Sequence, residues 1–242
     1  DLDFVDEIFV QPAASDRGLS LGSALLGSKK LEQSVPRGLQ NVYLGPTYGD
    51  EEIKKALDIS QTKYKYLEKP YLEAAKRIAK GEIVGWFQGR SEFGPRALGN
   101  RSILADPTRA NMKDLINSRI KFREKFRPFA PVMLYDFAKK HGILKEYPFM
   151  TIARFPNKKL AMKLKETVHY DGSTRIQTVR EKKHPLYNLL KRLEKRGYDP
   201  VLINTSFNIS GEPIVESPRD AVRTYMSSGI DTLYIEDYKV IK

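Results

Sequence analysis

The residues best suited to chemistry in this sequence are arginines that stand between glycines and a proline in residues 89–102, GRSEFGPRALGNRS. Arg90, Arg96 and Arg101 recur there without helical or strand periodicity, so the segment predicts a shaped loop. Glycines let backbone amides approach a ligand closely, and guanidinium groups hold phosphate or carboxylate oxygens through paired hydrogen bonds. This loop therefore predicts an anion site.

A second candidate is the basic segment KFREKFRPFAP, residues 121–131. Its cations are Lys121, Arg123, Lys125 and Arg127, and its phenylalanines are Phe122, Phe126 and Phe129. Cations at this density repel one another, and an anion bound between them removes the conflict. The alternative is a basic, exposed strand or turn that places the phenylalanines in the core, and this segment alone leaves both interpretations open.

The third candidate is NTSFNISGEPIV, residues 204–215, which follows the apolar segment PVLI. In open α/β sheets, ligands bind in the loops at the carboxyl ends of strands. We expect this segment to offer hydroxyl and amide groups to phosphate oxygens or adenine edges, from Asn204, Thr205, Ser206 and Asn208. The alternative is a turn whose side chains cap the next element. None of the three segments is specific when taken alone.

The elements that must position these segments alternate along the chain. We expect strands at residues 83–88, 102–105, 129–134, 150–155, 176–179, 201–206 and 232–237, and helices at 109–120, 184–197 and 217–229. This alternation indicates an α/β domain. The short spacing of some strands predicts a mixed rather than a wholly parallel sheet.

The first third of the chain has a different character. It predicts a strand at residues 4–12, a turn, and a small-residue helix at 18–27, followed by a linker rich in glycine and proline at 35–47. Helices are then expected at 49–57, with Asp50 as the cap, and at 70–81, ended by Gly81. Because the chain starts without methionine and enters directly into a strand-like segment, we expect it to be a fragment.

Composition narrows the classes of function. With 242 residues and no cysteine, the chain has room for one packed domain plus an appendage, and it has no disulfide, thiolate metal site or cysteine nucleophile, as suits a cytoplasmic protein. No apolar stretch is long enough for a membrane span. The net charge of +12 predicts an anionic partner: nucleic acid, an acidic membrane surface or a phosphorylated small molecule. Much of that charge lies in lysine-rich helical stretches, which we expect to be solvated faces.

Taken together, the strings EFGPRALGNRSILADP, KFREKFRPFAP, DGSTRIQTV and NTSFNISGEPIV resemble the C-terminal domain of O-carbamoyltransferases of the NodU/CmcH/TobZ type, over roughly residues 40–235. The resemblance implies a YrdC-like fold, which is an open, twisted, mixed sheet with flanking helices. Residues 1–35 resemble the end of the family's Kae1-like N-terminal domain. We therefore predict residues 1–35 as a Kae1-like remnant, and residues 36–242 as the YrdC-like carbamoyl-activating domain with its leading linker and helices.

The resemblance also implies a two-step reaction. The YrdC-like domain converts carbamoyl phosphate to carbamate and couples it to ATP, with Mg²⁺, to give carbamoyladenylate and pyrophosphate. The Kae1-like domain then passes the carbamoyl group to a substrate hydroxyl at an Fe²⁺-type centre. The implied partners are carbamoyl phosphate, ATP and the missing N-terminal domain, with no membrane. Only the first step is expected of this chain.

Residues are carried over by matching the family's motifs. Arg96, Lys121 and Arg127 match the family's catalytic positions. The resemblance implies that they act by charge stabilisation and positioning, without a nucleophilic side chain. The residues expected to bind ATP and substrate are Arg90, Arg101, Arg123, Arg175, Asn204, Thr205, Ser206 and Asn208.

Asp16 falls where the family places a metal-binding aspartate. The chain's histidines, His141, His169 and His184, lack metal-ligand spacing, so we expect Asp16 to be a single ligand without companions here. Ser91 departs from the family pattern, in which methionine precedes EFGPR, and we expect it to alter a hydrophobic contact only.

Two other functions remain open. A nucleic-acid-binding module would use the positive charge through counterion release, but the arginines lie in shaped loops with no aromatic stacking platform or known binding motif. Nucleic acid is therefore the less favoured partner. An enzyme similar to threonylcarbamoyl-adenylate synthases would share the chemistry, although the motifs match the carbamoyltransferases throughout.

Overall fold

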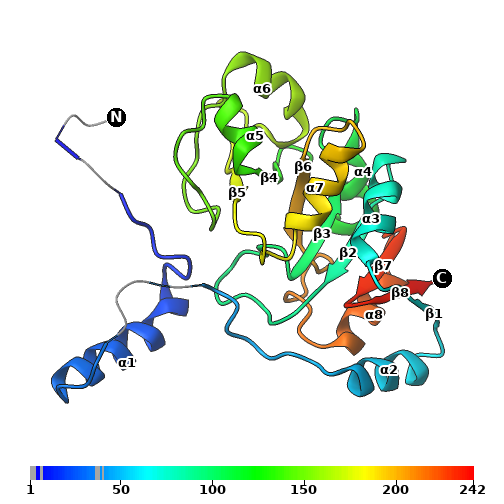
Figure 1. Cartoon of the computed structure of the whole chain (residues 1–242), viewed down its shortest axis with the longest axis horizontal. Coiled ribbons are helices and arrows are strands. Elements are labelled where there is room, and N and C mark those ends of the chain that lie inside the picture. The colour runs from blue at the N-terminus through cyan, green and yellow to red at the C-terminus, as the bar shows by residue number, and fades with distance from the viewer. Residues whose placement is uncertain (1–3, 6–7, 36–38, 40) are drawn as a thin grey trace.

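The architecture is one eight-stranded sheet with helices on both faces (Figure 1). The computed structural model describes residues 4–5, 8–35, 39 and 41–242. The strand order is β1-β8-β7-β2-β3-β6-β4-β5. The strands are β1 (Lys63–Tyr66), β2 (Val84–Phe87), β3 (Arg101–Ala105), β4 (Ala130–Leu134), β5 (Gln177–Val179), β6 (Val201–Ser206), β7 (Thr232–Ile235) and β8 (Tyr238–Ile241).

The sheet is mixed and open, as predicted. β2 pairs with β7, and β4 with β5, in parallel, whereas the other five pairings are antiparallel. β1 and β5 form its two edges. Among the described residues, no helix combines the length and the apolar character that a bilayer crossing requires.

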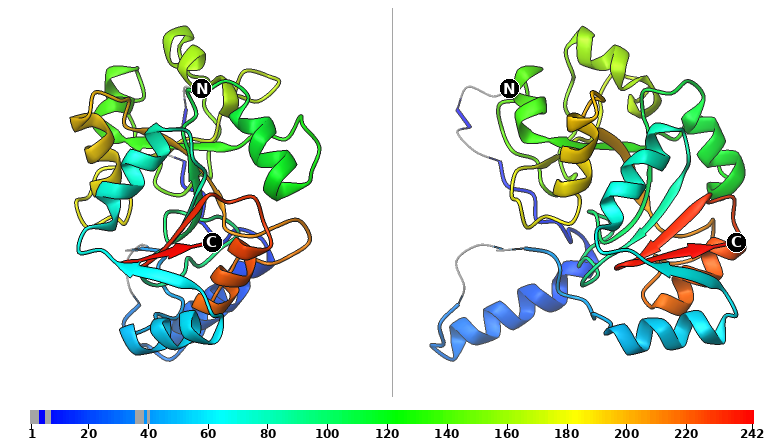
Figure 2. Two further views of the ribbon diagram at one scale, coloured as in Figure 1. Left: turned by 90° about the vertical axis from the view of Figure 1, so that its right-hand side faces the viewer. Right: turned by 45° about the vertical axis from the view of Figure 1, so that its right-hand side comes forward.

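Figure 2 shows helices on both sides of the sheet, and a hydrophobic core packs between the sheet and the helices on each side. One face carries α3 (Pro70–Ala79), α5 (Tyr135–Lys140), α6 (Lys158–Lys163) and α7 (Tyr187–Lys195), and the other carries α2 (Asp50–Ile59), α4 (Met112–Ile116) and α8 (Pro218–Met226). Successive residues of a strand alternate between the cores: Leu104 of β3 packs in the first core, and Ile103 in the second. The central strands are thus buried on both faces, which explains their continuous apolar character.

Local sequence signals set the ends of the helices. Ser217 and Asp220 form a reciprocal capping box at the start of α8, and Pro218 occupies the first helical position. α3 stops before Gly81, whose φ of 94° is the left-handed conformation that favours glycine. The predicted cap of α2 is wrong by one residue, because Gly49 is the cap and Asp50 already lies within the helix.

The predictions for residues 1–35 hold only in part. The helix is present as α1 (Leu19–Lys30), which buries none of its residues and lies apart from the sheet (Figure 1). The strand predicted at 4–12 is wrong for its described residues, because no neighbouring strand is available to pair with them. Pro12 and Ala13 are nevertheless buried, and the Pro12 carbonyl oxygen lies 3.0 Å from the position that a Cβ would take at Gly94.

Two further strand assignments needed the tertiary structure. Residues 150–155 do not form the predicted strand, because only Arg154 finds a partner, in an isolated bridge to Thr174. β1 and β8 were not predicted. β1 has the sequence KYKY, and its lysines gave no apolar signal for a strand that pairs with β8 at the edge of the sheet.

The register of β6 brings the three candidate segments together. β6 lies between β3 and β4 and is antiparallel to both, so its carboxyl end meets the start of each. Ser206 lies opposite Ser102, the last residue of the first arginine segment, and Asn204 lies opposite Ala130, near the end of the second basic segment. The linker adds a fourth segment, since Phe93 N–H donates to the Val42 carbonyl at 2.7 Å.

The first core gives a direct test of this packing. Leu189 of α7 is completely buried there, so Leu189→Ala should lower the free energy of unfolding by about 2–5 kcal/mol through lost burial and a residual cavity. The matched control is Lys195→Ala on the exposed side of the same helix, which should change it by less than about 0.5 kcal/mol. Urea denaturation of both variants measures the difference. Similar losses in the two would contradict the assigned faces of α7.

Candidate functional site

The three predicted segments line one cavity of about 100 Å³ at the carboxyl end of β6. Its walls also include two residues from the excursion between β4 and β5. The lining residues are Pro95, Arg96, Ala97, Arg123, Pro128, Phe129, Ala130, Met150, Arg175, Asn204, Thr205 and Ser206. Of these described lining residues, three are cationic and none is acidic.

The three cationic groups are the guanidiniums of Arg96, Arg123 and Arg175. Burial, followed by the charges of Arg96 and Arg123, lowers the pKa of Arg175, as expected for a guanidinium that the other two repel. Neither Arg96 nor Arg175 forms a hydrogen bond or ion pair with another described residue, and Nε of Arg175 is buried without a partner. An anion in the cavity would relieve this repulsion and supply the missing acceptors.

Arg123 differs from the other two because its guanidinium is supported by neutral groups. Its Nε donates to Oδ1 of Asn117 at 3.0 Å, and its plane lies 4.6 Å from the centre of the Phe129 ring. Asn117 begins a π-helical turn, η2 (Asn117–Lys121), that ends α4. These contacts hold the guanidinium at the cavity without neutralising its charge.

The end of β6 contributes polar groups to the cavity. Asn204 is buried and donates from Nδ2 to the Ala97 carbonyl at 3.2 Å and to Oε1 of Gln177 at 2.8 Å. Its Oδ1 is buried without a partner, so an acceptor remains available there. Thr205 and Ser206 also line the cavity, as the position after a strand predicts.

Lys121 lies behind the cavity wall rather than among the lining residues. It is 5% exposed, and Nζ donates to the carbonyl oxygens of Ser206 and Asn208 at 2.6 and 2.9 Å and to Oδ1 of Asn208 at 2.7 Å. Burial and the charge of Arg123 lower the pKa of Lys121 to about 7. In this structure Nζ of Lys121 therefore binds the loop after β6 and shapes it.

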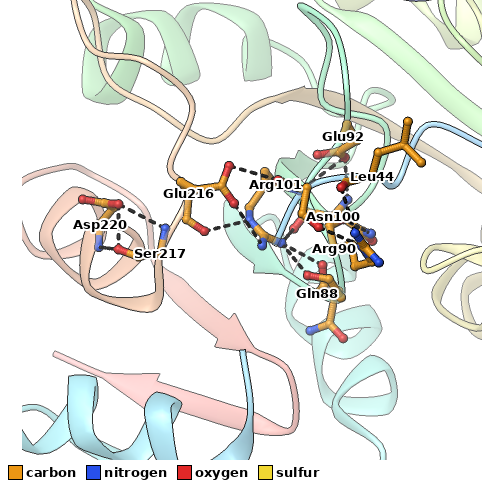
Figure 3. Close-up of polar contacts among 12 residues, drawn as sticks. Leu44, Gln88, Arg90, Glu92, Asn100, Arg101, Glu216, Ser217 and Asp220 are labelled. Atoms are coloured by element: carbon orange, nitrogen blue, oxygen red, sulfur yellow. Dashed lines mark hydrogen bonds and ion pairs between the residues drawn. The ribbon is translucent and has the colours of Figure 1, made fainter. Parts of the chain in front are cut away.

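Arg101 and Arg90 bind the protein's own backbone rather than the cavity (Figure 3). Arg101 is completely buried, with Nη1 donating to the carbonyls of Gln88 and Gly89 at 2.8 and 3.1 Å and its guanidinium 3.5 Å from the Phe87 ring centre. Arg90 donates to the carbonyls of residues 44 and 45 at 2.9 and 2.7 Å, which fixes the linker to the loop. Both are placed to stabilise the loop that carries Arg96.

The outer part of the second segment points to solvent. Arg127 is 55% exposed and pairs with Glu124 at 2.9 Å, outside the cavity lining. The alternative interpretation, a basic exposed turn with its phenylalanines in the core, holds for Phe129 only, because Phe122 and Phe126 are 63% and 75% exposed. The reason is the π-helical turn, after which Phe122 takes a left-handed φ of 42° and leaves the surface of the core.

Comparison with known proteins identifies the family. A model described as carbamoyltransferase C-terminus matches residues 75–242. The chain belongs to this family. Nodulation protein NolO of Bradyrhizobium diazoefficiens is 42% identical over 98% of the chain and 45% of its own length. The 3′-hydroxymethylcephem-O-carbamoyltransferase of Amycolatopsis lactamdurans is 34% identical over 95% and 43%, respectively.

These relatives confirm the predicted carbamoyltransferase resemblance, and the chain spans less than half of their length. Among solved structures, HypF of T. kodakarensis superposes on 74% of the chain and 22% of its own, with a TM-score of 0.50 and 18% identity. That likeness shows a shared α/β fold.

Asp16 lies before the residues that match the family, where it is exposed in a short 3-10 helix, η1 (Asp16–Gly18). Within the described ranges, no three side chains of the metal-ligating types gather into a group. Because a catalytic metal usually needs about three protein ligands, these residues alone do not fit an iron centre.

We expected Ser91 to alter a hydrophobic contact, but its side chain makes a polar contact in the structure. Its Oγ donates to Oε2 of Glu216 at 2.9 Å, and a Cβ built on Gly45 would fall 1.8 Å from that Oγ. Because Gly45 has no Cβ and the side chain of Ser91 is small, the linker can pass close to the loop.

Sequence reasoning missed a buried network behind the cavity. His184 Nδ1 accepts the Leu186 N–H at 3.1 Å, so Nε2 carries the proton and donates to the Tyr43 hydroxyl at 3.0 Å. Tyr43 donates to the Leu98 carbonyl at 3.2 Å, as does Gln177 at 3.0 Å. The available signal was Gln177, a polar residue inside an apolar strand, because buried polar groups need partners.

This network predicts a loss of stability in acid. Burial lowers the pKa of His184 from 6.5 to about 4, so between these values the unfolded chain binds a proton that the folded chain does not. The free energy of unfolding should therefore fall as the pH drops from 6.5 to 4, by up to about 1.4 kcal/mol per pH unit from this residue.

His184→Gln should remove that contribution, because glutamine does not titrate. Denaturant titrations of wild type and His184→Gln at several pH values give the two slopes. Equal pH dependence in both proteins would show that His184 is not the titrating group.

Proposed function

We propose that this domain binds carbamoyl phosphate and ATP and forms carbamoyladenylate, from which another part of the full-length enzyme transfers the carbamoyl group to a hydroxyl acceptor. The observation that carries the proposal is the convergence of Arg96, Arg123 and Arg175 on a cavity lined by no described acidic residue. Family membership and the relative named as an O-carbamoyltransferase support it. The cysteine-free sequence is compatible with a cytoplasmic reaction.

The proposed chemistry needs anion stabilisation more than covalent catalysis. Water first cleaves carbamoyl phosphate to carbamate and inorganic phosphate. A carbamate oxygen then attacks the α-phosphorus of ATP, the new C–O–P linkage forms, and the bond between the α- and β-phosphates breaks to release pyrophosphate. Apart from water, every reactant, intermediate and product of these steps is anionic, so positively charged donors fixed around the cavity lower the barriers.

The cavity is large enough for a small anion but not for the whole of ATP, so we propose two places for the substrates. About 100 Å³ holds a small anion, since a single water needs at least about 10–15 Å³. We therefore place the carbamate or a phosphate group in the cavity between the arginines, and the adenosine of ATP outside it. Mg²⁺ would arrive with ATP and share the charge of its phosphates. Thr205 and Ser206 would offer hydroxyl donors to the bound anion.

Substitution of the cavity arginines tests the site. Arg96→Ala and Arg175→Ala should each weaken carbamoyl phosphate binding by about 1.5–3 kcal/mol, roughly 10- to 150-fold, because each removes a charge-assisted hydrogen bond. Arg196→Ala, which removes the same charge from an exposed position beside α7, should change binding less than about twofold. Pyrophosphate release from ATP in the presence of carbamoyl phosphate, and calorimetric titration, measure the effects.

The same assay separates this proposal from diffuse polyanion binding. If the net charge of +12 were responsible, Arg196→Ala would be as harmful as Arg175→Ala, and a nucleic acid would compete. Arg127→Ala then tests the predicted catalytic part of that residue. Because Arg127 is exposed and paired with Glu124, a large effect would require the 121–128 loop to close over the ligand.

The transfer step is proposed to need residues outside this chain. The 242-residue chain should form carbamoyladenylate but should not carbamoylate a hydroxyl acceptor, with or without Fe²⁺, because Asp16 has no companion ligands among the described residues. Mass spectrometry of acceptor incubated with the chain, ATP and carbamoyl phosphate checks this. Carbamoylated acceptor that disappears in Asp16→Ala would overturn the separation of the two steps.

A further inference from the structure

The loop that carries Arg96 has a conformation that its own sequence does not determine. Gly94 and Gly99 flank it with φ values of 125° and 121°, which only glycine adopts readily. Glycines permit this turn, but they also permit many others, and the loop has no regular hydrogen bonding of its own. Another group must therefore select the observed conformation.

Glu92 is that group. Its Oε1 accepts the backbone N–H groups of Leu98 and Asn100, each at 2.7 Å, and of Arg101 at 3.3 Å (Figure 3). One carboxylate oxygen thus ties the start of the turn to its end, across the residues that include Arg96. Burial raises the pKa of Glu92, which means that the carboxylate is held there against a desolvation cost.

The carbonyl groups of the same turn are held from the opposite side. Asn204 donates to the Ala97 carbonyl at 3.2 Å, and Gln177 donates to the Leu98 carbonyl at 3.0 Å. The backbone around Arg96 is therefore bound on both sides, whereas its guanidinium has no partner among the described residues and lines the anion cavity.

We infer that Glu92 is a positioning residue for the activation reaction: its carboxylate fixes the turn so that Arg96 stands at the cavity together with Arg175. The identity of the bound anion in this inference rests on the proposed function, whereas the fixed conformation of the turn rests on the hydrogen bonds alone. A guanidinium that is already in place binds an anion without first ordering a glycine-rich loop, and displacement of a binding group by about 1 Å can cost roughly 100-fold in rate.

Two conservative substitutions of Glu92 distinguish the effect of side-chain length from the effect of side-chain charge. Glu92→Gln keeps the length of the side chain and an oxygen acceptor for the three N–H groups, whereas Glu92→Asp keeps the charge and withdraws the oxygen by one methylene. If position matters, amide hydrogen exchange at Leu98 and Asn100 should be at least about tenfold faster in Glu92→Asp, and its dissociation constant for pyrophosphate should rise about tenfold or more. Glu92→Gln should stay within about threefold of wild type in both measurements.

Glu52→Ala is the matched control, because this carboxylate also accepts a backbone N–H, from Gly49 at 2.9 Å, at the start of α2 and outside the cavity lining. It should lower the melting temperature without changing either measurement. Wild-type binding and slow exchange in Glu92→Asp, or equal impairment in Glu92→Gln, would overturn the inference. If wild type binds no pyrophosphate and releases none from ATP, the proposed function fails, and the exchange data alone decide whether Glu92 fixes the turn.

Discussion

The pairing of β6 with β3 on one side and β4 on the other is the constraint on which the site depends. Because β6 runs antiparallel to both neighbours, its carboxyl end lies beside the start of β3 and the start of β4. The arginine loop precedes β3, and the second basic segment precedes β4. One strand register therefore gathers segments that lie as far apart in the chain as residues 89–102 and 204–215. A shift of one residue would turn Asn204 to the other face of the sheet and away from the cavity.

Like charges brought together in this way need a rigid framework, and the domain provides it by dividing its cations into two groups. Arg96, Arg123 and Arg175 face the cavity. Arg90, Arg101 and Lys121 bind backbone carbonyl groups of the surrounding loops. The second group is as important as the first, because unpaired guanidiniums on mobile loops would separate and lose the high positive potential on which anion binding depends.

The distribution of charged groups in this domain can be compared with its family membership. The chain belongs to the carbamoyltransferase C-terminus family, and its relatives are more than twice its length. Within this domain, the cavity supplies a place for a small anion but gathers no group of metal-ligating side chains among the described residues. This distribution of charged groups is the basis on which we propose anion activation here and transfer elsewhere in the full-length enzyme.

The sequence by itself determined the class of the domain and the family to which it belongs, and it located the segments in which arginines gather. Continuous apolar strands that alternate with amphipathic helices require a sheet covered on both faces, and glycine-spaced arginines indicate an anion loop, because these signals depend on local periodicity and residue type. Only the tertiary structure decided which cations face the cavity. Arg101 and Arg96 stand five positions apart in one loop, yet Arg101 is buried against Phe87 and Arg96 lines the cavity. The exposed Phe122, the unpaired 150–155 segment and the Glu92 turn depend in the same way on partners distant in sequence, which local patterns do not encode.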